Sequence, residues 1–214
     1  MNSPIDAVVA MHNAFRHDIE IIDRAALESA RGKPGLEATV ERFRFFNEVL
    51  EWHAHGEDTV ILPLLESVAP DVYESYERDH RQLDAAFAEL NRAVSVRDPL
   101  ETARATKAFK FYLDAHLDKE DAHLYRLIRE RVAIPEQGRA VGLMGADTPP
   151  ERFPEVVAWM FPLIGTDDRV MMTRAWQMGM PPEAFANAAR LIEQAVGDGW
   201  PALAAQIPDL APAH

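Results

Sequence analysis

One motif occurs twice in this chain: a histidine, four residues later a glutamate, and directly after it an aspartate. The first copy is His53-Ala-His-Gly-Glu57-Asp58, and the second, 63 residues further on, is His116-Leu-Asp-Lys-Glu120-Asp121. On an α-helix, residues i and i+4 lie one turn apart on the same face, so each copy directs an imidazole and a carboxylate to one point. Such mixed nitrogen and oxygen ligands, supplied twice from facing helices, suit a pair of iron ions.

The elements that must position this motif are predicted to be helices. Long stretches without glycine or proline are rich in Ala, Leu, Glu and Arg, and strand signals are weak. Turn signals separate four such stretches, at about residues 4–29, 36–67, 70–96 and 99–132. Pro63 lies inside the second stretch and is expected to kink it. Four long helices joined by short turns predict an all-α, up-down-up-down four-helix bundle.

Each predicted helix carries one histidine within its apolar stripe, and the second and fourth helices add a glutamate. The candidate ligand set is His12, His53, Glu57, His80, His116 and Glu120. Taken singly, each of these is better explained as a hydrogen-bonded core histidine or an i,i+4 surface pair. Taken together, the alternation favours a metal site, because buried polar groups of this kind must be paired or ligate an ion.

The ligand types narrow the choice of metal. Four imidazoles and two carboxylates make a nitrogen and oxygen site without thiolate, and six groups exceed what one zinc ion takes. Two iron ions fit best, and manganese or zinc fits less well. Ferritin-like proteins differ, because they place Glu on two helices and Glu-x-x-His on the other two.

The spacing His12 … His53-x-x-x-Glu57 … His80 … His116-x-x-x-Glu120 resembles the hemerythrin-like (HHE cation-binding) domain family over about residues 5–132. The resemblance implies two non-haem iron ions with an oxo or hydroxo bridge, and Glu57 and Glu120 as bridging carboxylates. His12 and His116 would join the same iron or one each. It also implies a hemerythrin-like bundle at residues 1–134, followed by a helical extension at 135–214.

Oxygen-carrying hemerythrins have a fifth histidine, four residues after the one on the third helix, where this chain has Asp84. Asp84 could coordinate metal or accept a hydrogen bond from an outer group. Carriers also use a His-x4-Asp spacing that Asp121 satisfies, although Glu120 mirrors Glu57 and stays on the inward stripe. The missing histidine leaves a coordination position open to water, peroxide, O2 or NO, which favours redox chemistry or sensing over simple carriage.

Two further side chains are weaker candidates near the cluster. His123 is a possible outer group or extra ligand, and Tyr112 a possible second-layer or pocket residue, for which plain core packing is the more ordinary explanation. His17 and His55 are expected to point away from the site.

The segment 135–214 is rich in proline, glycine and methionine, and short helices are predicted at about 150–163, 167–178, 182–196 and 200–206. Its tryptophans and methionines form an apolar set too large to face solvent, so we expect it to pack on the bundle or across a dimer interface. The protein is thus expected to be a monomer or a homodimer.

Composition excludes several classes. The net charge is −13, which argues against nucleic acid or an anionic membrane as the main partner. There is no cysteine, hence no disulfide, thiolate catalysis or iron–sulfur cluster. No apolar run has membrane-spanning length and the first residues do not form a signal peptide, so a cytoplasmic location is expected.

Three functions remain open on the sequence. The first is a di-iron protein that binds O2 or a related small oxidant, with consumption of peroxide or NO as an enzymatic version. The second is an iron, oxygen or redox sensor, and the third is a metal-free helical interaction protein.

Overall fold

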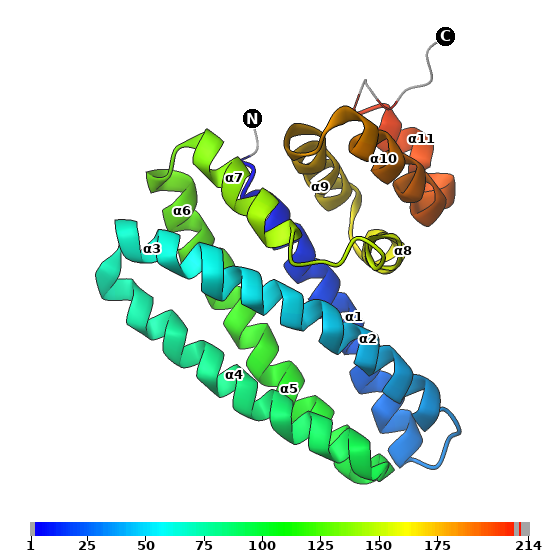
Figure 1. Ribbon diagram of the computed structural model, residues 1–214. Coiled ribbons are helices and arrows are strands. Elements are labelled where there is room, and N and C mark those ends of the chain that lie inside the picture. Colours follow the sequence, from blue (N-terminus) through cyan, green and yellow to red (C-terminus); the bar gives the residue numbers. More distant parts are fainter. Residues whose placement is uncertain (1–2, 208–209, 211–214) are drawn as a thin grey trace.

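The computed structural model describes residues 3–207 and 210, and these form helices joined by short connections, with no strand among them (Figure 1). The predicted all-α, hemerythrin-like bundle is confirmed, and further helices follow it. Four long arms make up the bundle, and the second and fourth arms are each built from three consecutive helical pieces. The arms are α1 (Asp6–Ala30); α2 (Leu36–Gly56), η1 (Glu57–Ile61) and α3 (Leu62–Val68); α4 (Pro70–Val96); and α5 (Pro99–Lys119), η2 (Glu120–Leu124) and α6 (Tyr125–Arg131).

The turns between the arms follow from local backbone chemistry. Gly32 and Gly35 both have positive φ, 86° and 134°, which a glycine adopts without steric penalty, and they reverse the chain between α1 and α2. Asp98 caps α5, since its side chain accepts hydrogen bonds of 2.9 Å from the backbone N–H groups of Leu100 and Glu101. Pro99 occupies the first turn of that helix, where its missing N–H is not needed.

The second and fourth arms are interrupted at the same place in the repeated motif. Both η1 and η2 are π-helical turns, and each begins at the motif's glutamate, Glu57 or Glu120. The sequence predicted a kink from Pro63, but the irregularity in the second arm begins before that residue. Because the fourth arm makes the same turn without a proline, Pro63 is not required for it. Single π turns inside α-helices frequently occur at functional sites.

Two apolar clusters fill the bundle, one on each side of the motif along the helix axes. One contains Phe15, Phe46 and Phe109 and extends to Leu50 and Leu117. The other contains side chains from the opposite ends of the same arms, among them Ile5, Ile61, Leu65, Tyr76, Leu124 and Tyr125. The polar residues of the motif therefore lie between two apolar layers, which exclude water from both directions.

The chain beyond the bundle forms α7 (Ile134–Gly145), α8 (Phe153–Leu163), α9 (Thr166–Gly179), α10 (Pro182–Val196), a 3₁₀ turn (Gly197–Gly199) and α11 (Trp200–Ala204). The sequence did not predict α7, because Pro135, Gly138 and Gly142 are typical of turns. Figure 1 shows α8 to α11 gathered beside α1, on the side away from α4. The small residues Ala7, Ala10 and Ala14 of α1 belong to the apolar cluster of these helices. No described helix combines the length and the apolar character needed to cross a membrane.

Candidate metal centre

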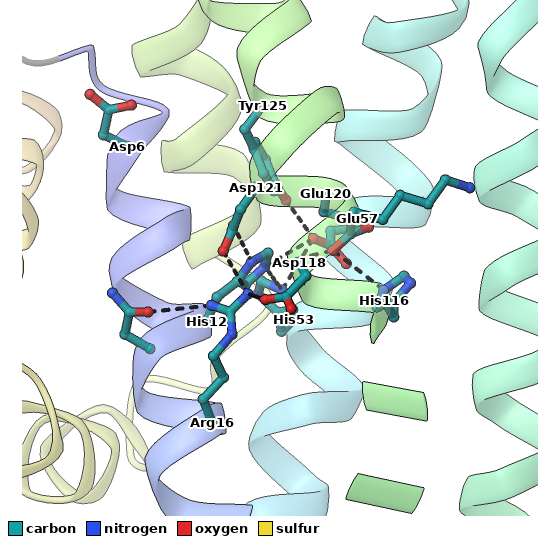
Figure 2. A network of polar contacts seen from close by, with 12 residues as sticks. Asp6, His12, Arg16, His53, Glu57, His116, Asp118, Glu120, Asp121 and Tyr125 are labelled. Carbon is teal, nitrogen blue, oxygen red and sulfur yellow. Dashed lines mark hydrogen bonds and ion pairs between the residues drawn. The ribbon is translucent and has the colours of Figure 1, made fainter. Parts of the chain in front are cut away.

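Six polar side chains from the four arms meet between the two apolar clusters. His12 comes from α1, His80 from α4, and the other four come from the two copies of the motif. Figure 2 shows His12 of α1, His53 and Glu57 of the second arm, and His116 and Glu120 of the fourth arm converging on one place. All six predicted residues are buried, with exposed fractions of 9% or less: His12, His53, Glu57, His80, His116 and Glu120.

The first half of the cluster consists of His12, His53 and Glu57. The Nε2 atoms of the two histidines face each other at 3.0 Å. Oε1 of Glu57 lies 3.2 Å from Nε2 of His53 and 3.5 Å from Nε2 of His12. Three potential ligand atoms thus point at one small volume.

The second half consists of His80, His116 and Glu120. Oε2 of Glu120 lies 3.3 Å from Nε2 of His116, and its Oε1 lies 3.4 Å from Nε2 of His80. Glu57 belongs to this half as well, since its Oε2 is 3.9 Å from Nε2 of His80. Oε2 of Glu120 in turn lies 3.8 Å from Nε2 of His12. Both carboxylates therefore lie between two histidine pairs, His12 with His53 and His80 with His116.

An aspartate orients each of the two histidines that lie outside the motif. Nδ1 of His12 is 2.8 Å from Oδ1 of Asp121, and Nδ1 of His80 is 2.7 Å from Oδ1 of Asp58. A carboxylate partner at Nδ1 favours the tautomer in which Nε2 is free to bind a cation. Asp121 was a candidate from the sequence. The role of Asp58 was missed, although its place in the repeat, directly after the glutamate, was a usable signal.

Tyr125 is a second residue that sequence reasoning missed. Its hydroxyl donates a hydrogen bond to Oε1 of Glu57, and the side chain is fully buried (Figure 2). Burial and the charges of Glu57 and Glu120 raise the pKa of Tyr125, so it remains a neutral donor. A tyrosine in an apolar stripe is indistinguishable in sequence from ordinary core packing.

The weaker candidates lie apart from the cluster. Asp84 and His123 have exposed side chains, and Tyr112 is 46% exposed. None of the three belongs to either half of the cluster. His17 and His55 are exposed as well.

The two carboxylates differ in acidity. Burial, reinforced by the charge of Glu57, raises the pKa of Glu120 to about 7. Burial acts in the same direction on Glu57, but the neighbouring His53 and His12 outweigh it and hold the pKa of Glu57 well below its usual range. The arrangement therefore favours one permanently ionised carboxylate beside one that gains or loses a proton near neutral pH.

Three of the histidines also differ from one another in pKa. Burial alone would lower the pKa of His12 and His80, but hydrogen bonds with Asp121 and Asp58 raise these values to about 9 and about 10. Burial, together with the positive charges of the other histidines, lowers the pKa of His116 to about 4. Without a cation, protons must take up the negative charge of the cluster.

An unpaired buried atom, as well as the geometry, indicates that the cluster can bind a cation. Oε2 of Glu120 is buried and has no hydrogen-bond partner among the described residues, although two imidazole nitrogens face it. A buried acceptor without a partner is costly, and a bound cation would satisfy it. Four imidazoles and two carboxylates form a donor set for a borderline metal ion and contain no thiolate.

The hemerythrin HHE cation binding domain model matches residues 3–128, and the chain belongs to that family. Zinc finger protein BRUTUS of Arabidopsis thaliana is 28% identical over 188 residues, which cover 85% of this chain and 15% of the relative. A BRUTUS-like zinc finger protein of the same plant is 22% identical and is matched over 16% of its length. The chain thus spans about a sixth of the length of these curated relatives. No solved structure matches it.

Proposed function

We propose that this protein is a non-haem di-iron protein that binds O2 or a related small oxidant, such as peroxide or NO. The observation that carries the proposal is the buried arrangement of two histidine pairs around two shared carboxylates. His12 and His53 would hold one ion and His80 and His116 the other, with Glu57 and Glu120 between them. In this proposal His12 and His116 belong to different ions, which is one of the two alternatives that the sequence left open.

Iron is preferred to zinc on its redox chemistry and not on the number of ligands, because two imidazoles and two shared carboxylates for each ion would also satisfy a four-coordinate zinc. A small oxidant must receive electrons, which iron ions held by these residues would supply and zinc ions could not. A redox role is also consistent with Asp84. This exposed residue stands four positions after His80, where oxygen-carrying hemerythrins have a fifth histidine, and it adds no imidazole.

The protein's own residues orient the ligands, hold a proton in the metal-free cluster and keep water away from the centre. Asp58 and Asp121 fix the rings of His80 and His12, and Tyr125 holds Glu57 by its hydroxyl. The pKa of Glu120 is about 7 in the metal-free cluster, so binding of a cation near neutral pH would release the proton of this carboxyl. The apolar clusters exclude bulk water along the bundle axis, which strengthens the electrostatic interactions within the site.

A sensor role is the second candidate, and one contact favours it. Helix α7 packs against α2 and against η1, the π turn that begins at Glu57. Gly56 lies so close to α7 that a Cβ there would be 3.1 Å from Cγ of Met144. A change in η1 on metal or oxidant binding would therefore be felt in the helices beyond the bundle. Protection of residues 134–145 from hydrogen exchange should then differ between the iron-loaded and iron-free proteins.

Iron content and an absorption spectrum test the main proposal. Protein expressed with ample iron should contain about two irons per chain and absorb in the near ultraviolet as ferric pairs do. His53→Ala and Glu120→Ala should lose much of this iron, whereas His55→Ala, two residues from His53 but exposed, should retain it. Equal iron in all three variants, or a colourless wild type without iron, would contradict the proposal.

A further inference from the structure

A large cavity lies between the bundle and the helices that follow it. Its volume is about 710 Å³, and residues of α1, α2, α7, α8 and α9 line it. Two exposed apolar side chains belong to this lining, Ile134 at 55% and Met178 at 65% exposure, so the cavity is open to solvent. Its volume lies within the range of small-molecule binding pockets, roughly 300–1,000 Å³, and far exceeds what O2 or peroxide occupies.

The lining is apolar and adaptable. Two tryptophans, Trp52 and Trp176, contribute flat surfaces. Five of the chain's eight methionines also line the cavity: Met11, Met144, Met172, Met178 and Met180. Methionine side chains are flexible and polarisable, so such a wall can adjust to the shape of an apolar ligand.

Glycines widen the cavity along α7 and at the end of α9. Gly138, Gly142 and Gly145 recur on one face of α7, and all three line the cavity together with Gly179. A Cβ added at Gly142, Gly145 or Gly179 would meet no atom within 4 Å. Gly142 and Gly179 are exposed, so this open space lies at the mouth of the cavity, and a larger side chain at either position would narrow it.

The cavity reaches the candidate metal centre at one residue. His53 is the member of the six-residue cluster that also lines the cavity, and its side chain is 6% exposed. Its Nε2 faces His12, and within the described part of the chain no hydrogen bond is seen at its Nδ1. A molecule in the cavity would therefore lie against the imidazole of His53.

The charge of the lining indicates a neutral occupant. Among the described residues that line the cavity, Arg139 is the one ionisable side chain besides His53, and its guanidinium is exposed and paired with Glu136. No carboxylate of these described residues lies in the wall to hold a cation, and the net charge of −13 opposes the approach of anions.

We propose that this cavity binds a neutral, predominantly apolar small molecule and holds it against His53. The binding itself is independent of any metal. The placement of the molecule beside iron rests on the proposed function, in which His53 is a ligand. The cavity then supplies a second binding site next to the redox centre, lined jointly by the bundle and by the helices after it.

The test uses the neutral fluorescent probe N-phenyl-1-naphthylamine with the full chain, both iron-loaded and iron-free. We expect saturable binding at about one site per chain, with energy transfer from the cavity's tryptophans. Gly142→Phe on α7 and Gly179→Phe at the end of α9 should each weaken binding by about tenfold or more, since either ring fills the opening. Ala88→Phe, at an exposed position of α4 outside the cavity, is the matched control and should bind as the wild type does.

The outcomes separate the two proposals. Absence of saturable binding, or unchanged binding in both glycine variants, overturns the cavity proposal; should Gly142→Phe fail to fold, Gly179→Phe decides. Probe binding to a protein that takes up no iron supports the cavity and overturns the di-iron function. Iron uptake without probe binding supports the di-iron function and overturns the cavity proposal. Iron loading should also reduce the emission of the bound probe, and unchanged emission contradicts its placement against His53.

Discussion

At the scale of single residues, the aspartates that follow each glutamate should control the strength of metal binding. Loss of an outer carboxylate partner of a metal-bound histidine typically costs about 10–100-fold in affinity. Asp121 is 21% exposed and Asp58 is 55% exposed, so the bond with His12 is the better shielded. We expect Asp121→Ala to weaken binding more than Asp58→Ala, measured by competition with a chromophoric chelator.

The matched control is Asp84→Ala. Asp84 is an aspartate one turn from His80, but its side chain is exposed and lies outside the cluster. Its removal should leave the metal affinity unchanged. A loss of metal affinity equal to that of Asp121→Ala would indicate that Asp84 is a metal ligand.

The stability of the metal-free protein should depend on pH through His12. The pKa of His12 in the folded protein, about 9, lies above the ordinary histidine value of 6.5, so its pairing with Asp121 stabilises the fold fully below about pH 6.5. This contribution is lost as pH rises through about 9. In urea unfolding, the stability difference between the iron-free wild type and Asp121→Ala should thus shrink between pH 6 and pH 10. A difference that grows over this interval would contradict the assignment.

The six buried residues of the centre were all candidates from the sequence, because helical spacing alone places a histidine and a glutamate on one face. Tyr125 and Asp58 were not predicted, for different reasons. Tyr125 lies in an apolar stripe, where a buried phenol has no distinguishing pattern. Asp58 bonds with His80 of another helix, a contact that depends on how the arms are rotated about their axes.

At the scale of elements, the paired π turns should be required for the site and not for the fold. A π turn accommodates one extra residue in a helix. Deletion of one residue within the turn therefore restores a regular α-helix, and the residues before Glu57 and after Ile61 keep their faces. Deleting Thr59 from η1 should therefore leave a folded, helical protein. The deletion shifts Asp58 and the residues next to Glu57 relative to His80, and metal affinity should fall about tenfold or more.

Thr59→Ala is the control for this deletion. The Thr59 side chain is exposed, and its hydroxyl donates a hydrogen bond to the carbonyl of His55 one turn earlier. The substitution should preserve metal affinity, measured by the same chelator competition. Normal affinity in the deletion variant would show that η1 has no role in positioning the ligands.

The long helices were predictable and the π turns were not. Apolar periodicity fixes the face of a helix over several turns, as in α1 and α4, but one additional residue such as Thr59 changes that pattern too little to detect. Helix α7 was missed because Gly138 and Gly142 signal a turn locally. Its helix is maintained by packing against α2 and α9, which only the folded chain reveals.

At the scale of the whole molecule, polar bonds across the bundle surface hold the later helices in place. Nε1 of Trp159, on α8, donates a hydrogen bond of 2.6 Å to Oδ2 of Asp18 on α1. Asp18 is fully buried and also accepts a hydrogen bond from Arg42 of α2. The carboxylate of Asp18 thus joins α1, α2 and α8. Burial raises the pKa of Asp18, and the hydrogen bonds from Trp159 and Arg42 oppose this effect by favouring the ionised form.

Trp159→Phe should consequently destabilise the protein. The variant keeps an aromatic ring of similar shape beside Phe15 and Phe45 but leaves one oxygen of a buried carboxylate without its donor. Such a loss costs about 1–3 kcal/mol. In urea unfolding the midpoint should fall. Trp200→Phe removes an indole on α11 that makes no such bond with any described residue, and it should change the midpoint much less. If the two variants are equally stable, the bond between Trp159 and Asp18 does not hold α8 on the bundle, and the cavity behind it would owe its shape to apolar packing alone.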